Sequence, residues 1–451
     1  MENISSIILA AGKGTRFKSE APKVCHNVGG LMLFCHVVKS CIDSGIKDIV
    51  LVVSPTLSDI YNEIPASFNQ SAKIRTAIQS KPLGTGDAAL CGFKQCSEKS
   101  EWIIILYGDT PLIQPKTIES MLQAADNRTG VVILAINPEN EAGYARLVSD
   151  QDGDIFSIVE EKDTASYKLR RGHSFLSLCN VGMLIRRKAA EKLLNKLLPS
   201  STTKEIYITN IISLAREDGW ICRYVVGKSQ ELKGINNRTD LAVVEKSFQE
   251  KMRASVIENG VELVSPETVY FSHDTIIEPG VKIHPFVTFG RAVTIRSGSE
   301  IRSFCAIEGA EIKSSAIIGP FARIRPGTLI QENSCIGNFV EVKKSNIGSG
   351  TKISHLSYIG DTSTGSDVNI GAGTITCNYD GFKKSKTNIG NKASVGANSS
   401  LIAPINIGAR AILGAGSVVT EDVPDDALAL GRAPQIILKG KAEKLRKKRA
   451  T

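Results

Sequence analysis

The sequence predicts two folds in one chain, an α/β domain with a mostly parallel sheet followed by a parallel β-helix. At 451 residues the chain exceeds what one hydrophobic core ordinarily supports. Strand-like runs alternate with helical patterns up to about residue 240, and aliphatic residues recur at every sixth position from about residue 275. We therefore expect an α/β domain over residues 1–238, a helical linker over 239–259 and a β-helix over 260–451.

The first domain contains strand and helix patterns in alternation. Ile4–Ala10, Asp48–Val53 and Trp102–Leu106 are strand-like apolar runs, whereas Met32–Ser44 and Gly84–Cys96 have helical spacing. Such alternation indicates a parallel sheet covered by helices on both faces. Ligands of these sheets bind at the carboxyl ends of the strands, so we expect the site in the loops that follow them.

The second domain carries an internal hexapeptide repeat, and Asp240–Met252 before it has the spacing of a connecting helix. The repeat is marked by Ile277, Ile283, Phe289, Ile295, Ile301 and Ile307; by Ile318, Ile324, Ile330, Ile336 and Val342; by Ile347, Ile353 and Ile359; and by Ile389, Val395, Leu401, Ile407, Leu413 and Val419. Each repeat supplies a short strand and a turn, with the marked residue in a shared interior. The 13-residue interval from Thr376 to Ile389 is one residue longer than two repeats and predicts an external loop.

The composition is that of an ordinary globular protein, with 42% hydrophobic and 22% charged residues. The longest apolar runs fall far short of the ~20 residues of a membrane span. The N-terminus has neither the basic region nor the cleavage-like site of a secretory signal, so we expect a cytoplasmic protein without membrane insertion. The ten cysteines form no C-x-x-C pair, and therefore we expect no zinc ribbon or redox motif.

Much of the net charge of +9 lies near the C-terminus. The basic residues of this tail are Lys439, Lys441, Lys444, Arg446, Lys447, Lys448 and Arg449. A solvated tail and a segment that attracts an anionic cofactor both fit this composition. Aromatic residues do not alternate with the basic ones, so we do not expect a nucleic-acid partner.

A glycine-rich segment follows the first predicted strand, with the sequence Leu9-Ala10-Ala11-Gly12-Lys13-Gly14-Thr15-Arg16. Small residues after a strand let backbone N–H groups approach phosphates closely. Arg16 and Lys23 add the cations that a triphosphate requires. The segment matches neither the P-loop nor the dinucleotide fingerprint, and a purely structural glycine turn remains an alternative.

Tyr107-Gly108-Asp109 ends the predicted buried strand at Trp102–Leu106. A carboxylate at the carboxyl end of a central strand is well placed to hold Mg²⁺ against phosphate oxygens, although turn and helix-capping aspartates are also common. Gln79 and Gly84-Thr85-Gly86 form a polar turn before a helix, and Gly234–Arg238 offers amide oxygens in a second glycine turn.

His355 stands out among the six histidines because of its position two residues after a repeat marker, in Ile353-Ser354-His355-Leu356-Ser357-Tyr358. A surface histidine is the ordinary alternative on a solenoid. Arg325 and Lys343 offer a phosphate its counter-charges, and Glu341 offers a carboxylate that can orient an imidazole. Further polar groups come from Tyr358, Asn369 and Asn378.

The front motifs resemble those of the sugar-1-phosphate uridylyltransferases, and most closely the bifunctional N-acetylglucosamine-1-phosphate uridyltransferase/glucosamine-1-phosphate acetyltransferase family. The motifs are Leu-Ala-Ala-Gly-Lys-Gly-Thr-Arg, Pro-Lys, Leu-Gly-Thr-Gly, Tyr-Gly-Asp and Gly-Ile-Asn-Asn-Arg. The resemblance implies a Rossmann-like nucleotidyltransferase fold in which Mg²⁺ is held by Asp109 and Asn236. It implies that UTP and the nucleotide sugar are bound by Leu9, Ala10, Ala11, Gly12, Lys23, Gln79, Gly84, Thr85, Tyr107, Gly108, Asp109, Gly143, Glu160, Asn180 and Asn236.

Pro320–Gly327, Gly337–Glu341 and Asn369–Gly381 resemble the same family. The resemblance implies a left-handed β-helix, a homotrimer with active sites between subunits, and His355 as the general base. It implies that glucosamine-1-phosphate is bound by Arg325, Lys343, Tyr358 and Asn369. It implies that acetyl-CoA is contacted by Ala372, Asn378, Tyr379, Ala397, Ala415 and Arg432.

The implied activity has two steps. The second domain acetylates glucosamine-1-phosphate with acetyl-CoA, and the first transfers UMP from UTP to the product, giving UDP-N-acetylglucosamine and pyrophosphate for bacterial peptidoglycan and lipopolysaccharide synthesis. The chain departs from the family pattern at Ala145, where glycine is usual, and at Ala397, where serine is usual. The alternatives are a monofunctional sugar nucleotidyltransferase with a structural or regulatory β-helix, and a structural trimerisation protein with an inactive front domain.

Overall fold

The computed structural model describes residues 3–12, 14–138, 144–151, 153–165 and 167–449. The chain forms two compact units, Met1–Phe248 and Gln249–Thr451. The boundary falls within helix α8 (Arg238–Glu258), which extends the expected connecting helix at both ends. Within the ranges described, we find no helix with both the length and the apolar character that crossing a membrane requires.

Strands and short helices alternate along the first unit. The strands are β1 (Ile4–Leu9), β2 (Asn27–Val28), β3 (Leu31–Met32), β4 (Asp48–Val53), β5 (Lys73–Ile78), β6 (Trp102–Tyr107), β7 (Thr129–Ile136), β8 (Arg146–Ser149), β9 (Ile155–Val159), β10 (Ser174–Arg186) and β11 (Ile221–Val226). The α-helices are α1 (Leu33–Asp43), α2 (Ala66–Ser71), α3 (Thr85–Phe93), α4 (Pro115–Gln123), α5 (Arg187–Leu193), α6 (Ile211–Glu217) and α7 (Ser229–Leu232). The 3₁₀ turns are η1 (Thr15–Phe17), η2 (Lys23–Cys25), η3 (Pro55–Glu63), η4 (Glu161–Asp163), η5 (Leu194–Lys196) and η6 (Ile208–Asn210).

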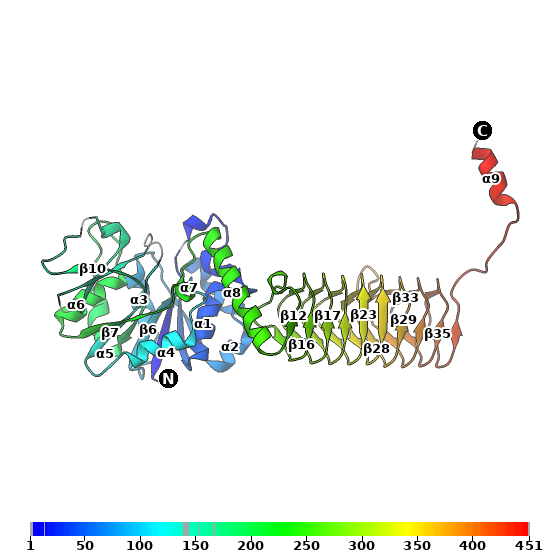
Figure 1. Cartoon of the computed structure of the whole chain (residues 1–451), viewed down its shortest axis with the longest axis horizontal. Coiled ribbons are helices and arrows are strands. Elements are labelled where there is room, and N and C mark those ends of the chain that lie inside the picture. The colour runs from blue at the N-terminus through cyan, green and yellow to red at the C-terminus, as the bar shows by residue number, and fades with distance from the viewer. Residues whose placement is uncertain (1–2, 13, 139–143, 152, 166, 450–451) are drawn as a thin grey trace. The chain divides into compact units, whose positions relative to one another are not determined.

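A nine-stranded sheet forms the centre of the first unit (Figure 1). Its main path runs in the order β11-β7-β10-β6-β1-β4-β5, with β8 and β9 attached beside β10. The strands β6, β1, β4 and β5 are parallel, whereas β10 is antiparallel to both β6 and β7. The predicted α/β fold is therefore confirmed, with one long antiparallel strand inside the sheet.

Both faces of this sheet are buried, as the apolar strand sequences predict. Ile8 and Ile104 pack in a core with α1 and α4, whereas Ile7 and Ile103 pack in a second core with α3, α5 and α6. The expected strand at Asp48–Val53 is β4 residue for residue, and the other expected helices and strands differ only at their ends. The carboxyl ends of β1 and β6 then lie side by side, because Leu9 is in register with Tyr107.

The second unit is a left-handed parallel β-helix of three sheets, which we name after their first strands (Figure 1). The β12 sheet contains β12 (Glu262–Leu263), β14 (Lys282–Ile283), β17 (Glu300–Ile301), β20 (Ile317–Ile318), β23 (Cys335–Asn338), β26 (Lys352–His355), β29 (Asn369–Ile370), β32 (Ser394–Val395), β35 (Ile412–Leu413) and β37 (Leu428–Ala429). The β13 sheet contains β13 (Ile276–Ile277), β16 (Val293–Ile295), β19 (Ala310–Ile312), β22 (Thr328–Ile330), β25 (Asn346–Ile347), β28 (Thr362–Thr364), β31 (Thr387–Ile389) and β34 (Ile405–Ile407). The β15 sheet contains β15 (Thr288–Phe289), β18 (Ala306–Ile307), β21 (Arg323–Ile324), β24 (Glu341–Lys343), β27 (Tyr358–Gly360), β30 (Ile375–Cys377), β33 (Ser400–Ile402) and β36 (Val418–Val419).

The hexapeptide repeat accounts for the interior of the β-helix. The marked residues form one continuous core, in which Ile283, Ile301 and Ile353 are fully buried. Chain order passes from the β12 sheet to the β15 sheet, then to the β13 sheet, and back one coil further on. Helix α9 (Lys441–Arg449) follows the last coil, in the basic tail.

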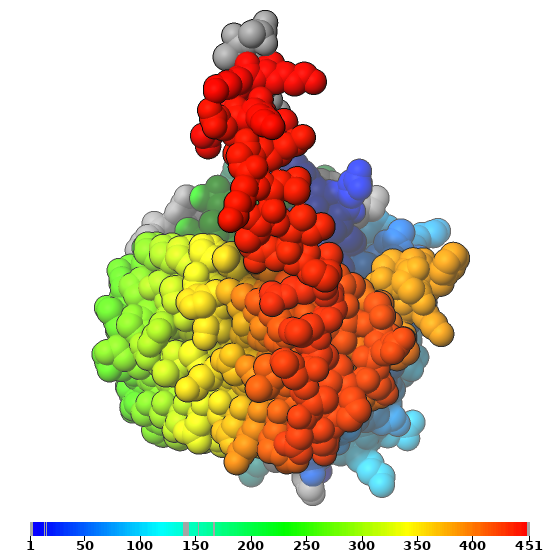
Figure 2. Space-filling view, turned by 90° about the vertical axis from the view of Figure 1, so that its right-hand side faces the viewer, coloured from blue at the N-terminus to red at the C-terminus, as the bar shows by residue number. Residues whose placement is uncertain are grey.

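The external loop is larger than the sequence interval suggests. Thr376 on β30 and Ile389 on β31 belong to consecutive strands of one coil, whereas the equivalent positions of the next coil, Leu401 and Ile407, are only six residues apart. The insertion therefore occupies one corner and is longer than a single residue. In Figure 2 this loop, in orange, stands out from the side of the β-helix.

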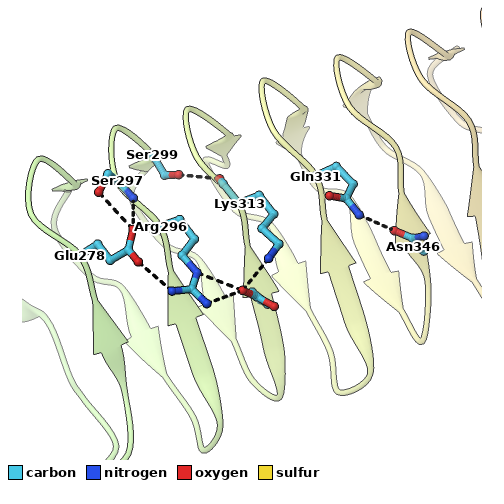
Figure 3. Close-up of polar contacts among 8 residues, drawn as sticks. Glu278, Arg296, Ser297, Ser299, Lys313, Gln331 and Asn346 are labelled. Carbon is cyan, nitrogen blue, oxygen red and sulfur yellow. Dashed lines mark hydrogen bonds and ion pairs between the residues drawn. The ribbon is translucent and has the colours of Figure 1, made fainter.

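The outward face of the β13 sheet is polar at its N-terminal end (Figure 3). Arg296 binds Glu278 at 2.7 Å and Glu311 at 2.8 Å, and Lys313 binds Glu311 at 2.9 Å. Farther along, the Gln331 amide donates a hydrogen bond to Asn346 at 3.3 Å. This face has the charge pattern of a solvated surface.

The corner between the β12 and β15 sheets is apolar instead. Phe286, Phe304, Phe321 and Phe339 occupy it on successive coils, and we call this set the aromatic ladder. Their rings stack with centroids 5.0, 4.8 and 5.1 Å apart, and they are 44–55% exposed. All four have φ between 56° and 64°, a conformation that is uncommon for residues with a side chain.

Candidate active sites

The glycine-rich loop after β1 lines a cleft of about 310 Å³ in the first unit. Of the residues predicted to bind the nucleotide, the cleft is lined by Leu9, Ala10, Ala11, Gly12, Lys23, Gln79, Gly84, Thr85, Tyr107 and Asp109. The Gln79 amide donates to the Gly84 carbonyl at 3.0 Å and to the Asp87 carboxylate at 2.8 Å, which fixes the turn before α3. Gly84 has φ 120°, and a Cβ there would lie 2.4 Å from the Ile206 carbonyl oxygen, so this turn requires glycine.

A second cleft, of about 600 Å³, adjoins the first. The two clefts share Thr85, Tyr107, Asp109 and Glu205 in their walls. The second cleft is also lined by Arg16, Glu160, Asn180 and Asn236, so the structure brings further residues predicted to bind the nucleotide sugar and Mg²⁺ beside the glycine-rich loop.

Asp109 lies where the two clefts meet, just after β6. Its carboxylate forms an ion pair with Lys23. The Ile235 amide donates to the Asp109 carbonyl at 3.0 Å, which fixes the loop that carries Asn236. Arg16 donates to the Asn236 side-chain oxygen at 3.1 Å. Cations and oxygen donors thus converge on one point of the cleft.

Burial shapes the electrostatics of the second cleft. It raises the pKa of Tyr107, and the nearby Glu160 charge raises it further. Asn180 donates to the Tyr107 hydroxyl at 3.3 Å. Burial also raises the pKa of Glu160, whose carboxylate accepts a 2.7 Å hydrogen bond from Thr209. These oriented polar groups suit the hydroxyls and amide of a sugar.

Gly108, Gly143 and Ala145 are three further positions that the sequence singled out in the first unit. Gly108 is buried behind the cleft, where its amide donates to the Leu9 carbonyl at 2.9 Å. Gly143 lies outside the described residues. Ala145 lines the second cleft, and its φ is not in the left-handed region, so alanine fits this backbone without strain.

In the second unit, His355 ends strand β26 at the corner between the β12 and β15 sheets. The equivalent positions on successive coils are Asn338, His355, Ala372, Ala397 and Ala415, which we call the corner column. Backbone hydrogen bonds link it from coil to coil, including 2.7 Å bonds to the carbonyls of Ala372 and Ala397. Arg432 donates to the Ala415 carbonyl at 2.8 Å and so lies at the end of the column.

The two halves of this corner differ in side-chain size. Beside Asn338 and the coils before it stands the aromatic ladder, whereas beside Ala372, Ala397 and Ala415 stand Gly373, Asn398 and Gly416. The glycines after Ala372 and Ala415 leave room along the surface beyond His355. Of the predicted acetyl-CoA residues, Ala372, Ala397, Ala415 and Arg432 form one strip that leads to the histidine, whereas Asn378 and Tyr379 lie on the inserted loop.

Polar side chains of the β15 sheet cluster around Gly360. A Cβ at this glycine would lie 2.6 Å from the Tyr358 hydroxyl and 2.8 Å from the Asn378 amide nitrogen, so both side chains cover it. The Asn378 amide donates to Asp361 at 2.5 Å. Lys343 is in register with Gly360 on the neighbouring strand.

The inserted loop brings Lys384 to the same cluster. Lys384 lies beside Lys343, and the Lys343 ammonium lowers the pKa of Lys384. Arg325 is held one coil away by Glu341, which accepts its hydrogen bond at 2.8 Å. This concentration of positive charge matches a phosphate dianion.

Asn369 lies apart from this cluster within one chain. It faces outward from β29 on the β12 sheet, whereas Arg325, Lys343 and Tyr358 belong to the β15 sheet or its following turn. Tyr379 is 59% exposed on the inserted loop, where its hydroxyl donates to the Gly381 carbonyl at 2.6 Å.

Sequence reasoning missed two residues of this site. It did not single out Lys384, although the loop's three closely spaced lysines were a signal. It assigned the orientation of His355 to Glu341, but that carboxylate binds Arg325, and the imidazole instead contacts Asn338. The 17-residue spacing between Asn338 and His355, one coil of this β-helix, was the signal.

Comparison with known proteins identifies the family of this chain. Residues 6–198 match the family of MobA-like NTP transferase domains. The chain is 42% identical over 434 residues to the Bifunctional protein GlmU of Zymomonas mobilis, covering 96% of this chain and 95% of that protein. It is 41% identical to the Bifunctional protein GlmU of Bartonella quintana, covering 99% and 98% of the two chains, and 39% identical to that of Agrobacterium fabrum, covering 98% and 96%. The chain therefore belongs to the GlmU family of bifunctional enzymes, which combine a uridyltransferase with an acetyltransferase.

Proposed function

We propose that the first unit joins N-acetylglucosamine-1-phosphate to UTP at Asp109, and that the second unit makes this sugar phosphate at His355. The meeting of the two clefts at Tyr107 and Asp109 carries the first assignment, since it places the cleft of the glycine-rich loop beside the cleft that Glu160 and Asn180 line. Glycine-loop amides would hold the phosphates in one cleft, and Glu160 and Asn180 would hold the sugar in the other.

The uridylyl transfer needs no covalent enzyme intermediate. A phosphate oxygen of the sugar phosphate attacks the α-phosphorus of UTP, the new P–O bond forms, and the bond to the departing pyrophosphate breaks. Lys23 and Arg16 position the two polyanions and neutralise charge on the oxygens. The Lys23 ion pair with Asp109 keeps this ammonium in the cleft before substrate arrives.

The residues at Asp109 fit a magnesium ion. Mg²⁺ is commonly held by one or two protein oxygens, with waters and substrate phosphates completing its shell. The Asp109 carboxylate and the Asn236 amide oxygen line one cleft and are linked through the Ile235 amide. No cluster of three acidic, histidine or cysteine ligands occurs among the residues described, so this pair is the donor set we propose. When bound, the ion would neutralise charge on the phosphates.

For acetyl transfer, His355 takes a proton from the amine of glucosamine-1-phosphate. The amine nitrogen attacks the thioester carbonyl of acetyl-CoA, the C–N bond forms and the C–S bond breaks. The imidazolium then returns its proton to the coenzyme A thiolate. The strip at Ala372, Ala397 and Ala415 suits a narrow pantetheine arm, and Ala397 offers backbone rather than side-chain contacts.

The phosphate of glucosamine-1-phosphate would lie against Lys343, Lys384 and Arg325. The proximity of Lys343 and Lys384 supports this, because two adjacent ammonium groups are repulsive until an anion joins them. Tyr358 and Asn378, which cover Gly360, would orient the sugar.

We propose a homotrimer in which the aromatic ladder and its corner face neighbouring copies. The ladder's exposed rings support this, since Phe is depleted from solvated surfaces and buries 150–250 Å² when covered. The position of Asn369 on a different sheet from Tyr358 supports completion of the site by another subunit. Use of UTP and acetyl-CoA, together with the scattered cysteines, supports a cytoplasmic location.

Omission assays test this function. Purified enzyme given glucosamine-1-phosphate, acetyl-CoA, UTP and Mg²⁺ should form UDP-N-acetylglucosamine, pyrophosphate and free coenzyme A. Omitting acetyl-CoA should stop all three products, and omitting UTP should leave coenzyme A release intact. Coenzyme A release that depends on UTP would contradict two separable sites.

A further inference from the structure

The imidazole of His355 is held by one side chain, that of Asn338. The two residues are register partners on β23 and β26, and His355 Nδ1 lies 2.5 Å from Asn338 Oδ1. The preceding residue, Gly337, allows this approach, because a Cβ there would lie 2.0 Å from the Ser354 carbonyl oxygen. His355 is otherwise exposed, and its Nε2 has no hydrogen-bond partner among the residues that the structure describes.

This contact selects one tautomer of the imidazole. An amide oxygen accepts hydrogen bonds and cannot donate them, so Nδ1 must carry the proton. In a neutral imidazole the other nitrogen, Nε2, then has the free lone pair. Nε2 is the atom that a general base needs to present to the substrate amine.

Within the described part of the chain, no charged side chain takes the place of Asn338 at the His355 imidazole. The residue stacked on His355 from the other side is Ala372. On the adjoining β15-sheet strands the outward titratable groups are Glu341, Lys343 and Tyr358, and Glu341 is bound by Arg325 at 2.8 Å. On the β12 sheet, Cys335 and Lys352 stand at the opposite ends of β23 and β26. An uncharged acceptor such as the Asn338 amide orients the imidazole ring. A carboxylate in its place would also stabilise the imidazolium and so keep the accepted proton on the ring.

We propose that Asn338 is the positioning residue of acetyl transfer, which keeps His355 protonated at Nδ1 and directs Nε2 toward the amine of glucosamine-1-phosphate. This inference rests on the proposed role of His355 as general base. Asn338 acts through His355 and needs no contact with substrate.

The test compares Asn338→Leu and Asn338→Asp with wild-type enzyme. Asn338→Leu keeps the volume and removes the acceptor, so kcat for acetyl transfer should fall about 10- to 100-fold, while the KM values for both substrates stay within about twofold. Asn338→Asp keeps an acceptor and should restore kcat at alkaline pH. Its carboxylate would stabilise the imidazolium, so the acidic limb of the kcat/KM profile should move to higher pH.

Asn346→Leu is the matched control, since Asn346 lies on the same coil but faces out from the β13 sheet, bonded to Gln331 (Figure 3). It should leave both activities unchanged, and uridylyl transfer should persist in every variant. Wild-type kcat and pH profile in Asn338→Leu would overturn the inference, as would equal losses in the Leu and Asp variants at all pH values. His355→Ala distinguishes the role of His355 as general base from the role of Asn338 as its positioning residue. If this variant retains acetyl transfer, the proposed general base is wrong.

Discussion

The two units gather their functional side chains in opposite ways. In the first unit, residues as distant in sequence as Leu9 and Asn236 meet at the carboxyl ends of parallel strands and line two adjoining clefts. In the second unit, the corner column places residues one coil apart in a row on an outer surface, and Asn369 on the β12 sheet lies apart from Tyr358 on the β15 sheet. A parallel sheet can therefore enclose a site within one chain, whereas a β-helix presents its site on an open surface, which we propose another copy completes.

This difference predicts that the two activities respond separately to substitution. The first unit should depend on single side chains at Asp109, and the second on assembly as well as on its own residues. Variants that remove one activity and preserve the other would support separate sites in the two units. A variant that removes both activities would contradict them.

Asp109→Ala should have the largest effect. It removes the ion-pair partner of Lys23 and the carboxylate proposed for Mg²⁺, so uridylyl transfer should fall by at least about 10³-fold, while coenzyme A release stays at the wild-type rate. Pyrophosphate release and thiol release measure the two activities in one preparation. Uridylyl transfer that survives at saturating Mg²⁺ would show that Asp109 is not a metal ligand.

Charges in the aromatic ladder should affect only the second activity. In Phe304→Glu/Phe321→Glu, repulsion between six buried carboxylates would prevent association of three copies, and acetyl transfer should fall roughly 100-fold with it, because the site would be incomplete. Sedimentation velocity gives the oligomeric state. Leu329→Glu on the outward side of β22 is the matched control and should stay assembled. A monomer with full acetyl transfer would refute sites shared between subunits.

Lys384→Met should weaken binding of one substrate. Loss of one charge-assisted hydrogen bond to the phosphate should raise the KM for glucosamine-1-phosphate about tenfold, with little change in the KM for acetyl-CoA. Lys383→Met, one residue earlier on the same exposed loop, should leave both constants unchanged. Equal effects of the two substitutions would indicate general electrostatic attraction instead of a specific contact.

The effect of Glu160→Gln on thermal stability should depend on pH. Burial raises the pKa of Glu160 above its ordinary value of 4.5, so between that value and the raised one the folded protein binds more protons than the unfolded chain. Its contribution to stability therefore falls as the pH rises through this window. The variant cannot ionise, so its thermal midpoint relative to wild type should increase as the pH rises from 4.5 through the raised pKa of Glu160. Glu161→Gln, at an exposed neighbour, should show no such trend.

Most of the architecture could be predicted from the sequence because it follows from periodicity. Two local patterns specify it directly. Alternate residues such as Ile7 and Ile8 pack in different cores, and the six-residue period buries Ile283 and Ile301. The residues that line the first site could also be named, since they occur in contiguous motifs after strands.

The second site was less predictable because its contacts join residues on different coils. The pairing of Asn338 with His355 depends on the register of β23 and β26, and the approach of Lys384 to Lys343 depends on the path of an inserted loop. The 13-residue interval from Thr376 to Ile389 predicted where the inserted loop lies but not how long it is. These two residues lie on consecutive strands of one coil, so the loop is longer than the one extra residue that the interval suggested.

The most direct test of two independent sites in one chain is a rescue experiment with His355→Ala. Supplied with glucosamine-1-phosphate, acetyl-CoA, UTP and Mg²⁺, this variant should form no UDP-N-acetylglucosamine above about 1% of the wild-type rate, given the 10²- to 10⁴-fold contribution of a general base. Supplied with N-acetylglucosamine-1-phosphate and UTP, it should form the product at the wild-type rate. Failure of this rescue would contradict the account.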